Sequence, residues 1–168
     1  MKEISRKEAL TLSQMTLEKA ELERSYPDIK TTFVPKPMHL ENILGDYKRK
    51  RFLENWWAYS AILGRWFCIP KGFVFDEESI PLLKGNNPEA GGVHDYFCRY
   101  DSDPVVSKTM AAKLYFEFQA YFDEMESGNW FNRAWDWTWR GVKSNFVKVW
   151  PGFYHKFPVM ATYEEITK

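Results

Sequence analysis

The sequence has no excess of charge of either sign. Its 168 residues include 23 lysines and arginines and 23 aspartates and glutamates, so the formal net charge is zero. Proteins that bind nucleic acid by neutralising its phosphates usually carry a basic excess, and we therefore consider nucleic acid an unlikely partner. Neutral charge does not argue against an interface inside a protein assembly.

Long apolar runs are also absent. No segment approaches the roughly 20 apolar residues that a membrane-spanning helix needs. The first residues, Met-Lys-Glu-Ile-Ser-Arg, do not open the apolar stretch of a signal peptide. We therefore expect no membrane partner, and a protein that is made and kept in a cytoplasm or packaged from one.

Cysteine and histidine are scarce. The two cysteines, Cys68 and Cys98, each lie in an apolar setting and are predicted to be reduced core residues. Neither has a second cysteine or a histidine at the usual spacing of zinc ligands, and the whole chain has three histidines. We therefore predict no metal site and no cofactor.

Aromatic residues, in contrast, are abundant. They make up 18% of the chain and include eight tryptophans. Large aromatic side chains bury much area, so this composition predicts a tight core, an adhesive surface, or both.

The first predicted helix, from residue 5 to about residue 25, carries two apolar stripes rather than one. At 100° per residue, one stripe contains Ala9, Leu10, Leu17 and Ala20, and the nearly opposite stripe contains Leu12, Met15 and Leu22. Two stripes predict a helix that is packed on both sides. One side would lie against the rest of its own domain, and the other against a loop or a neighbouring subunit. An equally good interpretation is that the helix has one wide apolar face, which a long connection of the chain covers.

The rest of the chain alternates between strand and helix signals. After an extended connection over 26–45, short runs of aromatic and β-branched residues predict strands over 48–52, 56–62, 65–69 and 73–75. Helices are predicted over 89–100, over 103–126 with Asp103 as N-cap and Pro104 at the first helical position, and over 130–149. The expected fold class is α+β, with a small antiparallel sheet packed against about three helices and an N-terminal helical extension.

This pattern divides the chain into a helix and extended arm (1–46), a core domain (47–152) and a C-terminal tail (153–168). Apolar residues cover more than half of the helix over 130–149, so either some of its tryptophans meet a second surface or the helix is nearly enclosed by its own domain. The predicted interface residues are Leu12, Met15, Leu22, Trp135 and Trp139.

Polar residues that could form a site gather between 76 and 99. They are Asp76, Ser79, His94, Asp95 and Arg99. Four interpretations stay open: a Ser–His–Asp arrangement that activates Ser79, metal-assisted hydrolysis with Asp76, His94 and Asp95 as ligands, the binding of a small ligand, or a structural network. In the structural network, Asp76 and Ser79 bond to a turn, His94 fastens that turn to the helix, and Asp95 pairs with Arg99.

The same region resembles a small family of unknown function found in phages and prophages. Its hallmark is matched by Gly72-Phe73, by Asp76, by Ser79-Ile80-Pro81, and then by His94-Asp95-Tyr96. The resemblance covers about residues 48 to 150. Two positions depart from it, because Phe75 stands where the family usually has threonine and Lys113 stands where an acidic residue is expected. If that acidic residue completes a functional site in the relatives, this chain lacks it, because position 113 is a lysine.

These observations lead to two functional hypotheses. The first is a bacteriophage virion or assembly component that acts through protein–protein contacts, with other virion proteins or with itself, in the virion or the host cytoplasm. The alternative is a small phage hydrolase, with the cell wall as a candidate substrate, that uses Asp76, Ser79, His94 and Asp95.

Overall fold

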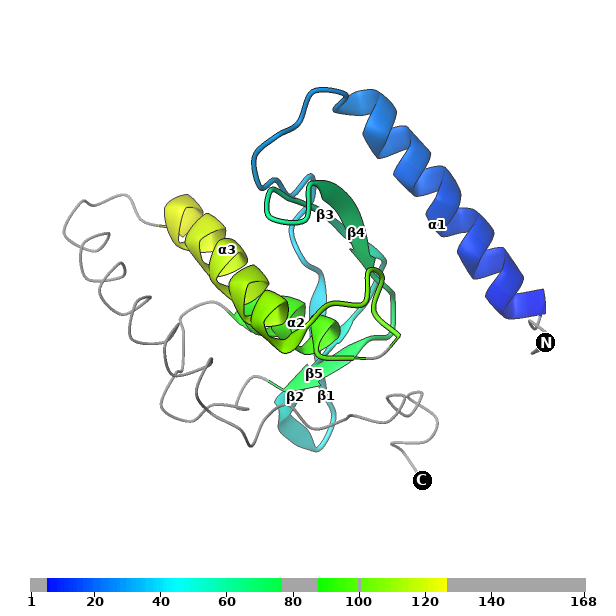
Figure 1. Ribbon diagram of the computed structural model, residues 1–168. Coiled ribbons are helices and arrows are strands. Elements are labelled where there is room, and N and C mark those ends of the chain that lie inside the picture. The colour runs from blue at the N-terminus through cyan, green and yellow to red at the C-terminus, as the bar shows by residue number, and fades with distance from the viewer. Residues whose placement is uncertain (1–5, 77–87, 100, 127–168) are drawn as a thin grey trace.

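The computed structural model describes residues 6–76, 88–99 and 101–126 (Figure 1). The predicted α+β class is confirmed by three helices and five strands in this part of the chain. In chain order the elements are α1 (Arg6–Ser25), β1 (Leu40–Ile43), β2 (Asp46–Phe52), β3 (Trp56–Ser60), β4 (Arg65–Ile69), β5 (Val74–Asp76), α2 (Pro88–Phe97) and α3 (Lys108–Glu126).

The strands form two antiparallel sheets rather than the single sheet expected. One has the order β1-β2-β5, and the other is the β3–β4 hairpin, in which Trp56 lies opposite Ile69 and Ser60 opposite Arg65. Strand β1 was not predicted, because it lies inside the segment 26–45 that was expected to be an extended connection. Its pairing depends on the turn to β2, where Gly45 has a φ of 83° that other residues rarely adopt.

Strand β3 has two different faces because successive side chains of a strand point in opposite directions. Trp56, Ala58 and Ser60 are buried, whereas Trp57 and Tyr59 are only partly buried. Figure 1 shows α3 on one side of the β3–β4 hairpin and α1 on the other. The buried face of β3 therefore lies toward α3, and Trp57 lies toward α1.

Aromatic rings fill the centre of the core. The Phe67 ring on β4 lies 4.9 Å from the Phe97 ring on α2, 5.5 Å from the Phe118 ring on α3 and 6.1 Å from the Trp56 ring on β3, measured between ring centroids. Phe67 thus joins the hairpin to both core helices.

Helix α2 packs closely on the three-stranded sheet. A Cβ atom at Gly92 would lie 3.3 Å from Phe75 Cε1 and 3.4 Å from Phe52 Cε2. The absence of a side chain at Gly92 therefore lets the backbone of α2 approach these two rings.

Helix α3 begins at Lys108, so the prediction that Asp103 and Pro104 open it was wrong. Ser107 is the N-cap, because its Oγ accepts a hydrogen bond from the Met110 N–H at 3.3 Å. Asp103 is engaged elsewhere: its N–H donates to the Tyr96 hydroxyl at 3.0 Å, and its carboxylate accepts from Arg65 at 3.2 Å. The predicted helix over 130–149 lies outside the described residues.

Candidate functional site

The predicted polar site centres on His94 and Asp95 in the last turns of α2. His94 Nδ1 lies 3.2 Å from Asp95 Oδ1, and the two side chains are only 10% and 12% exposed. The other side of the imidazole faces α3, where the Tyr115 ring centroid lies 5.8 Å away. This pair is therefore held between the two core helices.

The surroundings of His94 favour its protonated form. Burial by itself would lower the pKa of His94, but the hydrogen bonds from the ring to Asp95 and Cys98 outweigh this effect and raise the pKa above its ordinary value of 6.5. For the neighbouring Tyr115 hydroxyl, burial acts on the pKa in the opposite direction. Burial and the carboxylates of Asp123 and Asp95 raise the pKa of Tyr115 to about 12.

Cys98 belongs to the same cluster. Its Sγ lies 3.5 Å from His94 Nε2 and 3.9 Å from His94 Nδ1, one turn further along the chain. The sequence signal for this contact is the i,i+4 spacing of the two residues, but the sequence-based hypotheses had assigned the possible nucleophile to Ser79. Both cysteines are unpaired thiols, as predicted.

Arg99 does not pair with Asp95, in contrast to the expected i,i+4 contact. Its guanidinium instead forms a two-pronged hydrogen bond with Asp101, and it lies 5.4 Å from the centroid of the Phe73 ring. The hydrogen bonds from Arg99 lower the pKa of Asp101. Helix α2 ends at Phe97, so the chain turns before Arg99 and the helical spacing on which the expected pair depended is lost.

The other predicted site residues are not placed. The backbone of Asp76 ends β5 opposite Arg49 of β2, but its side chain lies outside the described residues. Ser79, Trp135 and Trp139 also lie outside them. The described structure therefore brings together His94 and Asp95 of the predicted set and adds Cys98.

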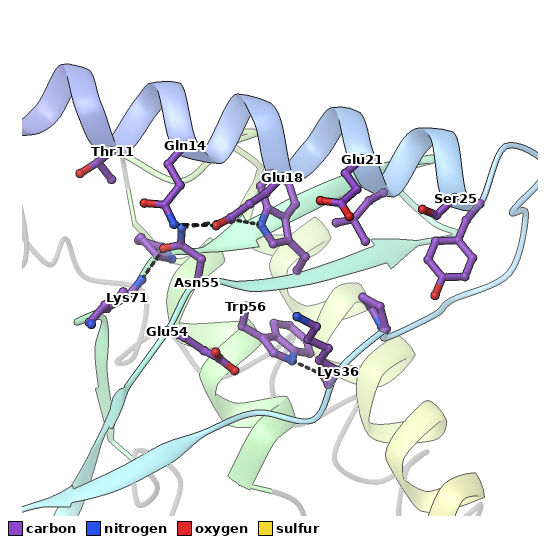
Figure 2. Close-up of a pocket in the computed structure, with 15 residues that line it drawn as sticks. Thr11, Gln14, Glu18, Glu21, Ser25, Lys36, Glu54, Asn55, Trp56 and Lys71 are labelled. Atoms are coloured by element: carbon purple, nitrogen blue, oxygen red, sulfur yellow. Dashed lines mark hydrogen bonds between the residues drawn. The ribbon is translucent and has the colours of Figure 1, made fainter.

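A second site candidate is the groove between α1 and the core, with a volume of about 800 Å³. Figure 2 shows Gln14, Glu18 and Glu21 of α1 above Glu54 and Asn55. Prolines and aromatic side chains complete the lining, including Tyr26, Pro35, Trp56, Trp57 and Pro70.

Glu18 attaches α1 to the core across this groove. Its Oε2 accepts hydrogen bonds from Trp57 Nε1 at 2.7 Å and from Asn55 Nδ2 at 3.2 Å, and its Oε1 accepts from Gln14 Nε2 at 2.9 Å. Asn55 Oδ1 in turn accepts from the Lys71 N–H at 3.0 Å. The strip of α1 that faces the core is thus polar.

Replacing Glu18 by alanine is expected to loosen α1. A hydrogen bond to a charged acceptor contributes about 1.5–3 kcal/mol, so losing the contacts to Trp57 and Asn55 should speed amide hydrogen exchange in residues 10–22 by about tenfold or more. Mass spectrometry of the peptides would measure this. The control is Glu23→Ala, since Glu23 makes an exposed ion pair within α1 to Lys19. Equal exchange rates in the two variants would show that Glu18 does not anchor the helix.

The predicted interface residues of α1 have different environments. Leu12 is exposed, whereas Met15 and Leu22 are partly buried and Leu22 lines the groove. Leu10 and Leu17, which belong to the other predicted stripe, are also exposed. The core-facing polar strip lies between the two apolar stripes.

Within the part of the chain that the structure describes, no group of three or more His, Cys, Asp or Glu side chains is arranged to hold a metal ion. None of the three described helices is long and apolar enough to cross a membrane. No protein-family model matches the chain, and no curated protein or solved structure matches it either.

Proposed function

We propose that this chain is an assembly component that acts through protein–protein contacts, and that the exposed leucines of α1 make these contacts. One observation carries the proposal. Leu10 and Leu17 of one apolar stripe and Leu12 of the other are 64%, 70% and 55% exposed, while the strip of α1 that faces the core contains Gln14, Glu18 and Glu21. A helix that served its own core alone would normally turn its apolar side inward.

The energetic argument concerns these leucines. A fully buried leucine side chain contributes about 2 kcal/mol relative to an exposed one, and this chain leaves most of that contribution unused at three positions of one helix. Thr16, which lies between Leu12 and Leu17 on the helix surface, adds little polarity there, because its hydroxyl donates to the Leu12 carbonyl oxygen at 2.8 Å within the helix. The exposed leucines of α1 thus support contact with an apolar surface of another protein.

The occupant that the sequence of α1 favours is α1 of a second copy. Residues 9–17 carry no charge and include Leu10, Leu12 and Leu17, whereas charged residues lie before and after them. A second copy offers the same uncharged, leucine-bearing segment, so a pair related by two-fold symmetry places these two segments against each other.

The phage setting is part of the same proposal and rests on the hallmark that includes Gly72-Phe73, Asp76 and His94-Asp95. We place the protein in the virion or in the host cytoplasm during assembly. A helical arm attached beside a core domain is compatible with this role, because α1 reaches the core through the polar contacts of Glu18.

The hydrolase alternative has one observation in its favour, the contact between His94 Nδ1 and Asp95 Oδ1. A carboxylate that orients an imidazole is part of many hydrolytic sites. Both side chains are nearly buried, and a substrate would need access to them. The assembly role is therefore the better-supported proposal.

Light scattering tests the assembly proposal. The expected mass at micromolar concentration is twice the 20.0 kDa of the chain, and the Leu12→Ser, Leu17→Ser double variant is expected to be a monomer. The Leu44→Ser, Leu53→Ser double variant is the control, because it makes the same chemical change at two exposed leucines outside α1.

Three outcomes have different meanings. A dimer that survives the change at Leu12 and Leu17 would move the interface away from α1. A wild-type monomer at all concentrations would overturn self-pairing. If the wild type is a monomer, the next comparison is how much wild-type and Leu12→Ser, Leu17→Ser protein is incorporated into particles. Equal incorporation of the two would also overturn contacts between α1 and any other assembly protein.

A further inference from the structure

Independently of its assembly role, the chain contains a thiol that packs against the edge of the core and lies beside an imidazole. Cys98 is partly exposed just beyond the end of α2, and its Sγ lies 3.5 Å from His94 Nε2. The imidazole contacts the Asp95 carboxylate at 3.2 Å through its other nitrogen. From this contiguous arrangement of thiol, imidazole and carboxylate we infer that Cys98 is a reactive thiol, activated by His94, that exchanges with low-molecular-weight disulfides.

The contacts of His94 supply the chemical reason. The thiolate is the reactive form of cysteine, and an adjacent imidazolium stabilises it. The Asp95 carboxylate contacts Nδ1, which also lies 3.9 Å from Cys98 Sγ, and it favours the positive charge of the ring. The Tyr115 ring of α3 also lies beside the imidazole, with 5.8 Å between the ring centroids, whereas the Asp123 carboxylate acts on the Tyr115 hydroxyl. The contact with Asp95 therefore favours a charged ring beside Cys98.

The exchange reaction balances without a further reactant. The Cys98 thiolate attacks one sulfur of a disulfide R–S–S–R, the S–S bond breaks, and a mixed disulfide forms between Cys98 and one R–S group. The other R–S group leaves as a thiolate and takes a proton from water. In this step the Cys98 sulfur is oxidised to the disulfide level and the departing sulfur is reduced to the thiol level, so no other oxidant or reductant is needed.

The second cysteine of the chain is a built-in reference. Cys68 lies in β4, is only 4% exposed and contacts no histidine in the described structure. Burial, together with the negative charge of Glu18, raises the pKa of the Cys68 thiol and disfavours its thiolate. The two thiols can therefore be compared in one molecule under one condition.

The experiment incubates the full chain with oxidised glutathione at neutral pH and follows mixed-disulfide formation at each cysteine by peptide mass spectrometry. Cys98 is expected to react at least about a hundredfold faster than Cys68. It is also expected to react several-fold faster in the folded protein than in the same protein unfolded in urea. That comparison is decisive, because partial burial without activation would make a folded thiol slower than an unfolded one.

The variant His94→Gln separates activation from simple access. It keeps a polar side chain beside Cys98 but removes the ring, and we expect it to slow the reaction of Cys98 about tenfold while Cys68 stays unreactive. If this variant unfolds, Cys68 becomes reactive too, and the comparison of the folded and unfolded wild-type protein then decides alone. A Cys98 thiol that reacts more slowly in the folded wild type than in urea would overturn the inference.

Discussion

Replacing Phe67 by alanine is expected to lower the free energy of unfolding by about 4 kcal/mol. Phe67 is 2% exposed, and its ring contacts those of Trp56, Phe97 and Phe118, which come from β3, α2 and α3. The substitution removes a ring from the point at which these elements meet and leaves a cavity that rigid aromatic neighbours fill poorly. Urea unfolding followed by circular dichroism would measure the loss.

The matched control for this change is Val105→Ala, because Val105 is 65% exposed between α2 and α3. It should alter the free energy of unfolding by less than about 0.5 kcal/mol. Phe67→Leu should fall between the two, since leucine fills part of the ring volume. A loss below about 1 kcal/mol in Phe67→Ala would mean that the hairpin and the helices do not share one core.

Replacing Glu117 by alanine is the second large effect, with an expected loss of about 3 kcal/mol. Glu117 lies on α3, and one carboxylate accepts three hydrogen bonds: from Ser60 Oγ at 2.6 Å, from Thr32 Oγ1 at 2.5 Å and from the Ile62 N–H at 3.1 Å. Ser60 is fully buried, so its hydroxyl would lose its acceptor inside the protein. Glu117 thus fastens both the β3–β4 turn and the connection after α1 to α3.

Glu124→Ala provides the control, because it removes the same side chain from an exposed position on the same helix. It should leave the unfolding midpoint nearly unchanged. Glu117→Gln should recover part of the loss, because an amide oxygen still accepts hydrogen bonds but does so without charge. Equal midpoints for Glu117→Ala and Glu124→Ala would show that the carboxylate of Glu117 does not stabilise the turn.

Local sequence patterns predicted the helices and strands better than they predicted the contacts between distant parts of the chain. The strands β2 to β5 and the helices α1 and α2 agree with the sequence to within a few residues, because alternation and helical spacing are local signals. Strand β1 could not be found in this way, since Leu40–Ile43 becomes a strand only by pairing with β2. The start of α3 was misplaced for a similar reason, because a hydroxyl on α2, that of Tyr96, holds the Asp103 N–H.

The candidate site shows the same division. The sequence placed His94 and Asp95 on one helix, and their contact follows from adjacent positions on α2. It did not indicate that Arg99 would bond to Asp101, because this depends on where α2 ends. His94 and Cys98 are four residues apart, a spacing that places them on one helix face, but Cys98 entered the candidate site only when the structure showed its Sγ within 3.5 Å of the imidazole.

The sequence by itself determined that this protein has a neutral, aromatic-rich α+β domain with a two-striped helix before it, since composition and periodicity are properties of the chain alone. Only the tertiary structure decided which side of that helix faces the core. The partly buried donors of Trp57 and Asn55 need an acceptor, and Glu18 supplies it. This requirement turns a polar strip inward and leaves Leu10, Leu12 and Leu17 on the surface, where we propose that a second copy covers them.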